Sequence, residues 1–179
     1  MRAARHAAET SGRPDALERP ERQANASPTS GAGLQTVLGA NGVIGRELSR
    51  ALERRGIPVR QVSRHPVRVH ASDELVQADL LDPKAVDRAV AGSEVAYLVA
   101  GLRYDTSVWR AQWPLVMRNA IEACARHGTR LAFFDNVYPY GRVHGAMTES
   151  TPFNPCSRKG DIRAQVATLL LDAMREGSV

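Results

Sequence analysis

The stretch LGANGVIGREL, residues 38–48, constrains the fold of this chain more than any other. Its glycines Gly39, Gly42 and Gly45 recur at three-residue intervals where an apolar run ends and a helical pattern begins. A glycine-rich turn between a strand and a helix directs backbone N–H groups and the positive helix end toward one point, where a pyrophosphate can bind. A packed corner is the alternative. We interpret Gly39 as permitting the sharp turn, Gly42 as letting a ligand approach, and Gly45 as letting helix and strand pack closely. The context favours dinucleotide binding.

Strand-like and helix-like segments alternate around this turn, from Leu34 to the end of the chain. Short apolar strands are expected at residues 35–38, 59–62, 75–78, 94–100 and 131–134. Helices are expected at residues 43–55, 83–91, 108–126 and 157–174. The first helix is expected to bury one apolar face, formed by Ile44, Leu48, Ala51 and Leu52. Such alternation predicts an α/β fold with a doubly wound parallel sheet and right-handed crossovers.

Composition narrows the class of protein. Residues 1–33 contain almost no large apolar side chain and are expected to be disordered, which leaves residues 34–179 as one domain. The basic residues behind the net charge of +5 are scattered, which argues against nucleic-acid binding. No apolar run approaches the length of a membrane span. Cys124 and Cys156 show no metal or redox spacing, and the histidines do not pair, so we expect no metal site and a cytoplasmic protein.

The end of the second expected strand selects the dinucleotide. An acidic residue there would bind the ribose hydroxyls of NAD, whereas an arginine suits the 2′-phosphate of NADP. The chain has Ser63 and Arg64 at this place and no acid, with Arg60 nearby. We therefore predict NADP, with NAD possible and a solvated loop residue as the alternative role of Arg64. Asp79 is expected to accept a hydrogen bond from the adenine amino group, and Asp82 to cap the following helix.

The complete set expected at the cofactor lies in the glycine turn and at the carboxyl ends of the first four strands. Its members are Gly39, Asn41, Gly42, Ile44, Gly45, Ser63, Arg64, Asp79, Leu80, Ala100 and Gly101.

Four short motifs, in this order and spacing, resemble the short-chain dehydrogenase/reductase superfamily. They are GANGVIG, Ala78-Asp79-Leu80, the strand end LVAG at 98–101 and VYPYG at 137–141. The resemblance is closest to the extended and atypical branches, the NAD-dependent epimerase/dehydratase group, and runs from about Leu34 to the end. It implies a Rossmann-type sheet with helices on both faces and a nicotinamide cofactor. Because the family's substrate portion follows a sixth strand, we expect this chain to be truncated, incomplete after the fifth strand and the helix that follows.

The same resemblance locates the catalytic positions. The family uses a Ser or Thr shortly before a Tyr-Gly pair, then Tyr-x-x-x-Lys at a helix start. These positions fall on Asn136, Lys159 and Arg163, so the chain departs from the family pattern at all three. We expect Arg163 to hold the nicotinamide ribose, Lys159 to act as acid or base, and Asn136 to bind a substrate carbonyl. A solvated pair of cations screened by Asp161 is the alternative, and Tyr140 is expected to be a packed aromatic.

Two further expectations concern packing. Tyr104, Trp109 and Trp113 are expected to pack in the core along the long helix, with a substrate wall as the alternative role. The fifth strand is expected to leave an apolar edge that a second copy in a homodimer would cover, if truncation is not the explanation. The function expected is that of an NADP-preferring, epimerase/dehydratase-like oxidoreductase acting on a carbonyl or sugar-nucleotide-like substrate. The alternative is an NADP(H) sensor of the same fold without turnover.

Overall fold

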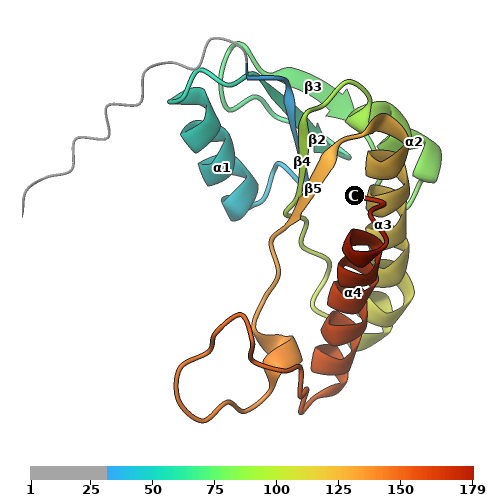
Figure 1. Ribbon diagram of the computed structural model, residues 1–179. Coiled ribbons are helices and arrows are strands. Elements are labelled where there is room, and N and C mark those ends of the chain that lie inside the picture. Colours follow the sequence, from blue (N-terminus) through green and yellow to red (C-terminus); the bar gives the residue numbers. More distant parts are fainter. Residues whose placement is uncertain (1–31) are drawn as a thin grey trace, which may run out of the picture.

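The computed structural model describes residues 32–179, and its core is a five-stranded parallel sheet (Figure 1). The strands are β1 (Gln35–Leu38), β2 (Val59–Ser63), β3 (Glu74–Gln77), β4 (Val95–Leu98) and β5 (Arg130–Phe133). The helices are α1 (Val43–Glu53), α2 (Pro83–Val90), α3 (Thr106–His127), the short 3-10 helix η1 (Tyr138–Tyr140) and α4 (Arg158–Arg175). The strand order is β3-β2-β1-β4-β5, which confirms the predicted doubly wound fold. The disorder expected for residues 1–33 falls outside the described residues, except for the last two.

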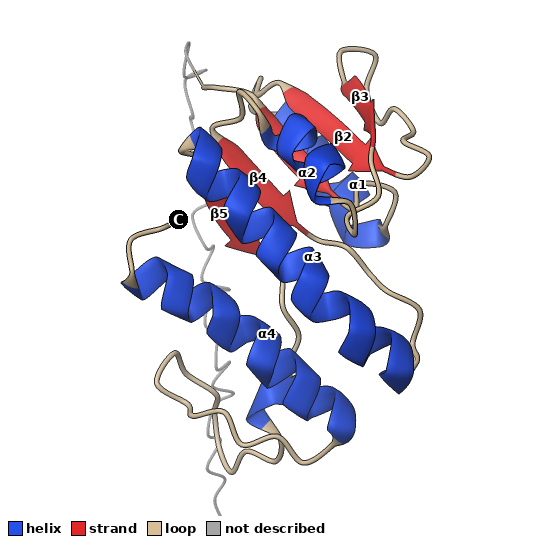
Figure 2. Ribbon diagram, turned by 90° about the vertical axis from the view of Figure 1, so that its right-hand side faces the viewer, coloured by secondary structure: helices blue, strands red, loops and turns tan. Residues whose placement is uncertain are grey.

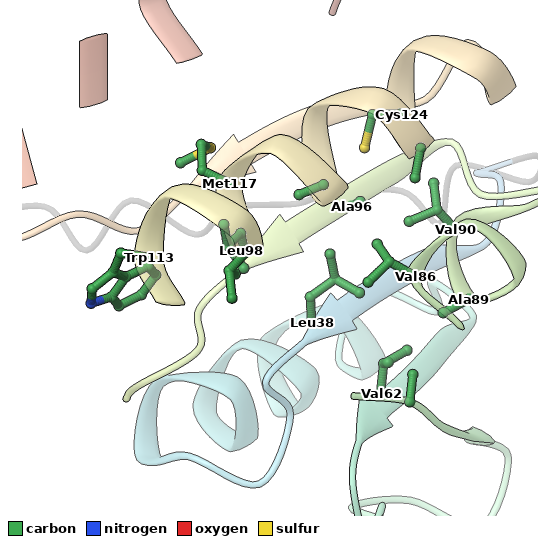
Figure 3. Close-up of a cluster of buried hydrophobic side chains, with 14 of the residues drawn as sticks. Leu38, Val62, Val86, Ala89, Val90, Ala96, Leu98, Trp113, Met117 and Cys124 are labelled. Atoms are coloured by element: carbon green, nitrogen blue, oxygen red, sulfur yellow. The ribbon is translucent and has the colours of Figure 1, made fainter. Parts of the chain in front are cut away.

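Helices cover both faces of the sheet, which explains why β1 is buried at every position. On one face Val37 packs against α1 through Leu52. On the other face Leu38 belongs to the larger core, which joins the sheet to α2, α3 and α4. Figure 3 shows the part of this core that lies between the sheet, α2 and α3. Alternate residues of one strand therefore enter two separate cores.

Helix α4 is packed on α3 rather than directly on the sheet, and the two helices run side by side in Figure 2. Ile162, Val166 and Leu170, spaced four apart, form its buried stripe. Within the described chain β5 is one of the two edge strands, and the following Phe134 is 59% exposed. The expected apolar edge is therefore present.

The face of α1 that meets the sheet is only partly the one we predicted: Leu52 is buried and Leu48 packs beside it, but Ile44 does not take part. Ile44 is 39% exposed, whereas Gly45, Ser49 and Leu52 are buried. Small residues occupy this face because the helix lies very close to the glycine turn. A Cβ on Gly45 would lie 2.8 Å from the Cα of Ala40. The hydroxyl of Ser49 donates to the Gly45 carbonyl, at 2.8 Å, which satisfies a buried polar group within the helix itself.

The connection from β2 to β3 contains no helix. Its loop is organised by Asp73, which is 3% exposed and accepts hydrogen bonds from the amides of Val69 and His70, both at 2.8 Å. The same carboxylate oxygen accepts from Gln61 of β2 at 2.9 Å. This loop leaves the carboxyl end of β2 uncovered, beside the glycine turn.

Candidate functional site

The glycine turn after β1 is shaped by contacts with its neighbouring strands. Gly39 has a φ of +96°, and a Cβ there would lie 2.5 Å from the Cα of Ala100, just beyond β4. The amides of Gly39 and Ala40 both donate to the carbonyl of Val62 in β2, at 2.9 and 3.1 Å. Only glycine fits at position 39, because a side chain would be strained and would also collide with the next strand.

Gly42 differs from the other two glycines of the turn. Its backbone is extended, with φ of −69°, and the nearest atom to an added Cβ is the carbonyl oxygen of Gly39 at 3.5 Å. A side chain at this position is therefore compatible with the protein itself. Gly45, in contrast, is required by its close contact with Ala40. This difference separates a glycine that the fold needs from one that it does not.

A pocket of about 650 Å³ opens beside Gly42 at the carboxyl edge of the sheet. It lies where the chain crosses from one side of β1 to the other, which is the topological switch point of an open α/β sheet. Four loops line it, and they follow β1, β2, β3 and β4. Of the residues expected at the cofactor, those lining the pocket are Gly39, Asn41, Gly42, Ser63, Arg64, Asp79, Leu80, Ala100 and Gly101.

Ile44 and Gly45 do not line this pocket. Both lie in the first turn of α1, where Ile44 is partly exposed and Gly45 packs against Ala40. The expected role of Gly45 in close packing agrees with its contacts. A contact between the Ile44 side chain and a ligand in the pocket is not supported by this geometry.

The arginines near β2 have different surroundings. Arg64 lines the pocket, is exposed, and makes no ion pair with any residue between 32 and 179. Arg60 instead donates to the carbonyls of Ala89 and Ala91 at the end of α2, at 2.7 and 2.8 Å, and pairs with Glu74 at 3.0 Å. Arg60 therefore serves the fold rather than the pocket, because its position in β2 directs it toward α2.

Two polar contacts hold the pocket loops in place. Asn41 donates from its side-chain amide to the His65 carbonyl at 2.7 Å, which ties the glycine turn to the loop after β2. Asp79 accepts the amide of Leu81 at 3.0 Å with one carboxylate oxygen. Asp82 accepts the amide of Lys84 at 2.9 Å and caps α2, as expected.

Sequence reasoning missed part of the lining. The residues it did not name include His65, Leu102, Arg103, Val108, Gln112 and Val116. Val108, Gln112 and Val116 are spaced four apart on α3, so they form one stripe of that helix. That spacing was visible in the sequence, but which side of α3 meets the pocket depends on how the helix crosses the sheet.

The three positions expected to be catalytic are Asn136, Lys159 and Arg163, and none of them lines the pocket. Lys159 and Arg163 are one helical turn apart, and Arg163 binds Asp135, the residue before Asn136. Arg163 is 3% exposed and donates from Nε to Oδ1 of Asp135 at 2.8 Å, with a second contact from Nη2. Its guanidinium carbon lies 4.3 Å from the centre of the Trp113 ring. A solvated pair of cations is therefore wrong for Arg163, because it is enclosed by a carboxylate and aromatic rings.

Lys159 has a different set of partners. Its ammonium lies 3.3 Å from the centre of the Tyr104 ring and 5.6 Å from that of Trp109. Asn136 accepts the amide of Tyr138 with its Oδ1 at 3.0 Å. Lys159 and Arg163 do not share a partner, although they are one helical turn apart.

The aromatic residues of α3 pack as expected. Trp109 and Trp113 are 6% and 3% exposed, and their rings meet edge to face at 6.4 Å. Tyr104, which precedes the helix, is instead exposed, although its ring meets that of Trp109 at 5.5 Å in a T-shaped arrangement. Tyr140 packs against Phe153 at 5.2 Å, which agrees with its expected role as a packed aromatic.

Residues 32–179 contain neither a cluster of metal ligands nor a helix suited to cross a membrane. No group of three or more His, Cys, Asp or Glu side chains is arranged to hold a metal ion in this part of the chain. None of its helices combines the length and the apolar character needed to cross a membrane.

A parallel sheet of this order, with a glycine turn after β1 and a pocket at its carboxyl edge, defines a Rossmann-type α/β fold. Residues 35–176 match the sequence model of the NAD dependent epimerase/dehydratase family. The chain therefore belongs to this family, which confirms the resemblance to short-chain dehydrogenases/reductases. Over 78 residues the chain is 40% identical to the ceramide reductase of Caulobacter vibrioides, a match that covers 41% of this chain and 25% of that protein.

Solved structures with the same fold include three that contain NAD. The Bordetella bronchiseptica enzyme WbmG superposes with a TM-score of 0.70 at 18% identity, over 81% of this chain and 51% of that one. A short-chain dehydrogenase/reductase superfamily protein from Agrobacterium tumefaciens gives 0.69 at 25% identity, over 82% and 46%. The UDP-glucose 4-epimerase of Thermus thermophilus gives 0.68 at 22% identity, over 80% and 51%. The chain spans about half the length of these structures.

Proposed function

We propose that residues 34–179 bind a nicotinamide dinucleotide in the pocket at the carboxyl edge of the sheet. Gly42 carries this proposal, because the fold would accept a side chain there and yet the residue faces the pocket as a glycine. A ligand that contacts the backbone closely, such as a pyrophosphate at the start of α1, accounts for the missing side chain. Membership of the NAD dependent epimerase/dehydratase family supports the same ligand.

The chain is proposed to prefer NADP. Arg64 is an exposed cation without an ion-pair partner in the described chain, and it stands where the adenosine ribose would lie. The segment from Ser63 to His65 offers no carboxylate to bind ribose hydroxyls. The three superposed structures contain NAD, so this preference is proposed for this chain and not carried over from them.

Titration with NADPH and NADH tests both parts of the proposal. NADPH should bind more tightly, and Arg64→Ala should weaken it by about 1.5–3 kcal/mol, the usual value of a charge-assisted contact, while leaving NADH unchanged. Arg130→Ala is the matched control, because Arg130 is an exposed arginine at the start of β5 and pairs with Glu94. Equal affinities in the parent protein would contradict the NADP preference without affecting the dinucleotide site.

The activity proposed is hydride transfer between the nicotinamide and a carbonyl or sugar-nucleotide-like substrate. Family membership and the partial match to a reductase support this class of reaction. The direct measurement is the loss of NADPH absorbance in the presence of ketones and of nucleotide sugars. Turnover of any of these substrates would establish the class.

A sensor that binds NADP(H) without turnover is the second candidate. Arg163, at the position of the family's lysine, is buried and bound to Asp135, which favours a structural role for this residue. Tight cofactor binding combined with no hydride transfer to any substrate tested would support the sensor.

A further inference from the structure

We propose that Tyr138 is the proton-transfer residue of this site and that Asn136, Lys159 and Arg163 all act through it. The inference deepens the proposed oxidoreductase function and rests on it. It starts from one observation: Asn136 contacts Tyr138, Lys159 contacts its partner Tyr104, and Arg163 contacts Asp135, whose carboxylate also accepts the amide of Asn136.

Tyr138 is held from three sides. Its amide donates to Oδ1 of Asn136 at 3.0 Å. Its ring stacks on the buried Trp109, with centres 6.2 Å apart and planes 25° apart. Its carbonyl oxygen would lie 2.8 Å from a Cβ on Gly160, so the glycine allows η1 to pack directly on the first turn of α4. Two of these contacts fix the backbone of Tyr138 and one fixes its ring, while the residue stays 38% exposed; proton transfer depends on such positioning before it depends on pKa.

Arg163 contributes to this arrangement through Asp135. Oδ1 of Asp135 accepts Nε of Arg163 at 2.8 Å and also the amide of Asn136 at 2.7 Å. The buried guanidinium thus orients a carboxylate, the carboxylate orients Asn136, and Asn136 holds Tyr138. The geometry makes Arg163 and Asn136 positioning residues, and it needs an arginine because two nitrogens of one fork contact the same carboxylate.

The hydroxyl of Tyr138 has two polar neighbours. Its oxygen lies 3.4 Å from that of Tyr104, and the Lys159 ammonium lies over the face of the Tyr104 ring. The hydrogen bond with Tyr104 raises the pKa of Tyr138 above its usual range, and the nearby Lys159 charge acts in the opposite direction. Tyr138 therefore remains protonated at neutral pH and can donate a proton.

The tyrosine pair is linked to the pocket through residues next to it in the sequence. Arg103 lines the pocket and Tyr104 is the next residue, while Val108 lines it directly before Trp109. Tyr138, a few residues beyond the carboxyl end of β5, adjoins this segment, because its hydroxyl oxygen lies 3.4 Å from that of Tyr104 and its ring stacks on Trp109. A substrate bound beside the nicotinamide end of a dinucleotide would therefore meet these two hydroxyls.

The proposed step is the reduction of a carbonyl. The carbonyl carbon accepts a hydride from the reduced nicotinamide, and the carbonyl oxygen takes the proton of the Tyr138 hydroxyl, which gives an alcohol, oxidised nicotinamide and a Tyr138 phenolate. The Lys159 ammonium then offsets the charge of the phenolate, in line with its lowering effect on the pKa of Tyr138. A proton from water restores Tyr138.

The test uses the titration of tyrosine itself, because the chain has only four tyrosines. With ¹³Cζ-labelled tyrosine, Tyr138→Phe assigns one NMR signal, which in the parent should titrate above the usual range. Tyr104→Phe should lower this pKa and Lys159→Met should raise it further. Tyr140, whose ring packs on Phe153, provides the matched control: Tyr140→Phe should leave the pKa of Tyr138 unchanged. If Tyr138 titrates in the usual range and neither variant moves it, the inference is wrong.

A second measurement relates Tyr138 to the cofactor. The nicotinamide ring is positively charged in NADP⁺ and neutral in NADPH, so NADP⁺ should lower the pKa of Tyr138 relative to NADPH and to 2′-phospho-ADP-ribose. If all three ligands bind but leave the Tyr138 titration identical, the proton-transfer role fails and dinucleotide binding stands. If none of them binds, the proposed function fails and this inference fails with it.

Discussion

The first turns of α1 and α4 are built in opposite ways, the first directly after β1 and the second after η1 and the loop that follows it. Around α1 the turn is kept free of side chains: Gly39 and Gly42 leave the backbone bare beside a pocket of about 650 Å³. Around α4 the space is filled, because Lys159 is covered by Tyr104 and Arg163 is enclosed by Asp135 and aromatic rings. One helix start exposes its backbone to a ligand, whereas the other organises side chains.

The two kinds of site differ in how many parts of the fold they require. A backbone site needs only short-range features, namely a strand, glycines at fixed spacing and a helix. The side-chain site needs partners from α3, from the end of β5 and from η1, so changing one residue alters the environment of several others. The predictions below test this contrast, from the largest expected effect to the smallest.

Arg163→Met should cause the largest loss of stability. Removing one partner of a buried ion pair leaves the other charge uncompensated, which costs about 3–5 kcal/mol. Urea unfolding measures the change, and Asp135→Asn combined with Arg163→Met should recover part of it. A loss below about 1 kcal/mol would mean that the pair contributes no more than a surface contact, and the contrast with the glycine turn would disappear.

Gly42→Val and Gly39→Ala should separate binding from folding. Gly42→Val should reduce the affinity for NADPH and NADH by about 100-fold or more, equal to about 2.7 kcal/mol, with unfolding unchanged. Gly39→Ala should destabilise the fold by about 3 kcal/mol, because it combines a positive φ with a contact to Ala100. A Gly42→Val protein that binds both cofactors normally would contradict the proposed pyrophosphate position.

The thiol of Cys124 reports whether α3, the helix next to both regions, stays closed to solvent. It is fully buried on α3, and burial raises the pKa of its thiol to about 12. The thiol of the unfolded chain ionises near pH 8.5, so the contribution of the buried neutral thiol to the free energy of unfolding is fully present below that pH. Above it this contribution should fall by about 1.4 kcal/mol per pH unit, up to pH 12. The free energy of unfolding of the parent should thus drop more between pH 8 and pH 10 than that of Cys124→Ala. Equal pH dependence would mean that α3 opens to solvent.

Lys159→Met should have the smallest effect on stability. A cation over an aromatic ring near the surface contributes about 0.5–1 kcal/mol, and Tyr104 is exposed. The same unfolding measurement as for Arg163→Met gives a direct comparison of two cations one helical turn apart. A loss as large as that of Arg163→Met would show that the first turn of α4 depends on both cations equally.

Much of the pocket could be predicted from the sequence, because its residues follow strands at positions that the fold brings to one edge. Ser63, Asp79 and Ala100 were found in this way, since carboxyl ends of parallel strands meet wherever the order of strands requires it. Ile44 was assigned to the buried face of α1 because apolar residues usually face the core. Gly45 and Ser49 face it instead, and the close approach of the helix is a tertiary property.

By itself the sequence determined the order of strands and helices, the glycine turn and the absence of an acid after β2, because these depend on neighbouring residues and on periodicity. Only the tertiary structure decided the partners of Arg163 and Lys159. Their positions on α4 were predictable, but Asp135, Tyr104 and Tyr138 approach them from segments 20 or more residues away. A charged side chain takes its role from the groups that enclose it, and those groups are assembled only when the sheet and its helices pack together.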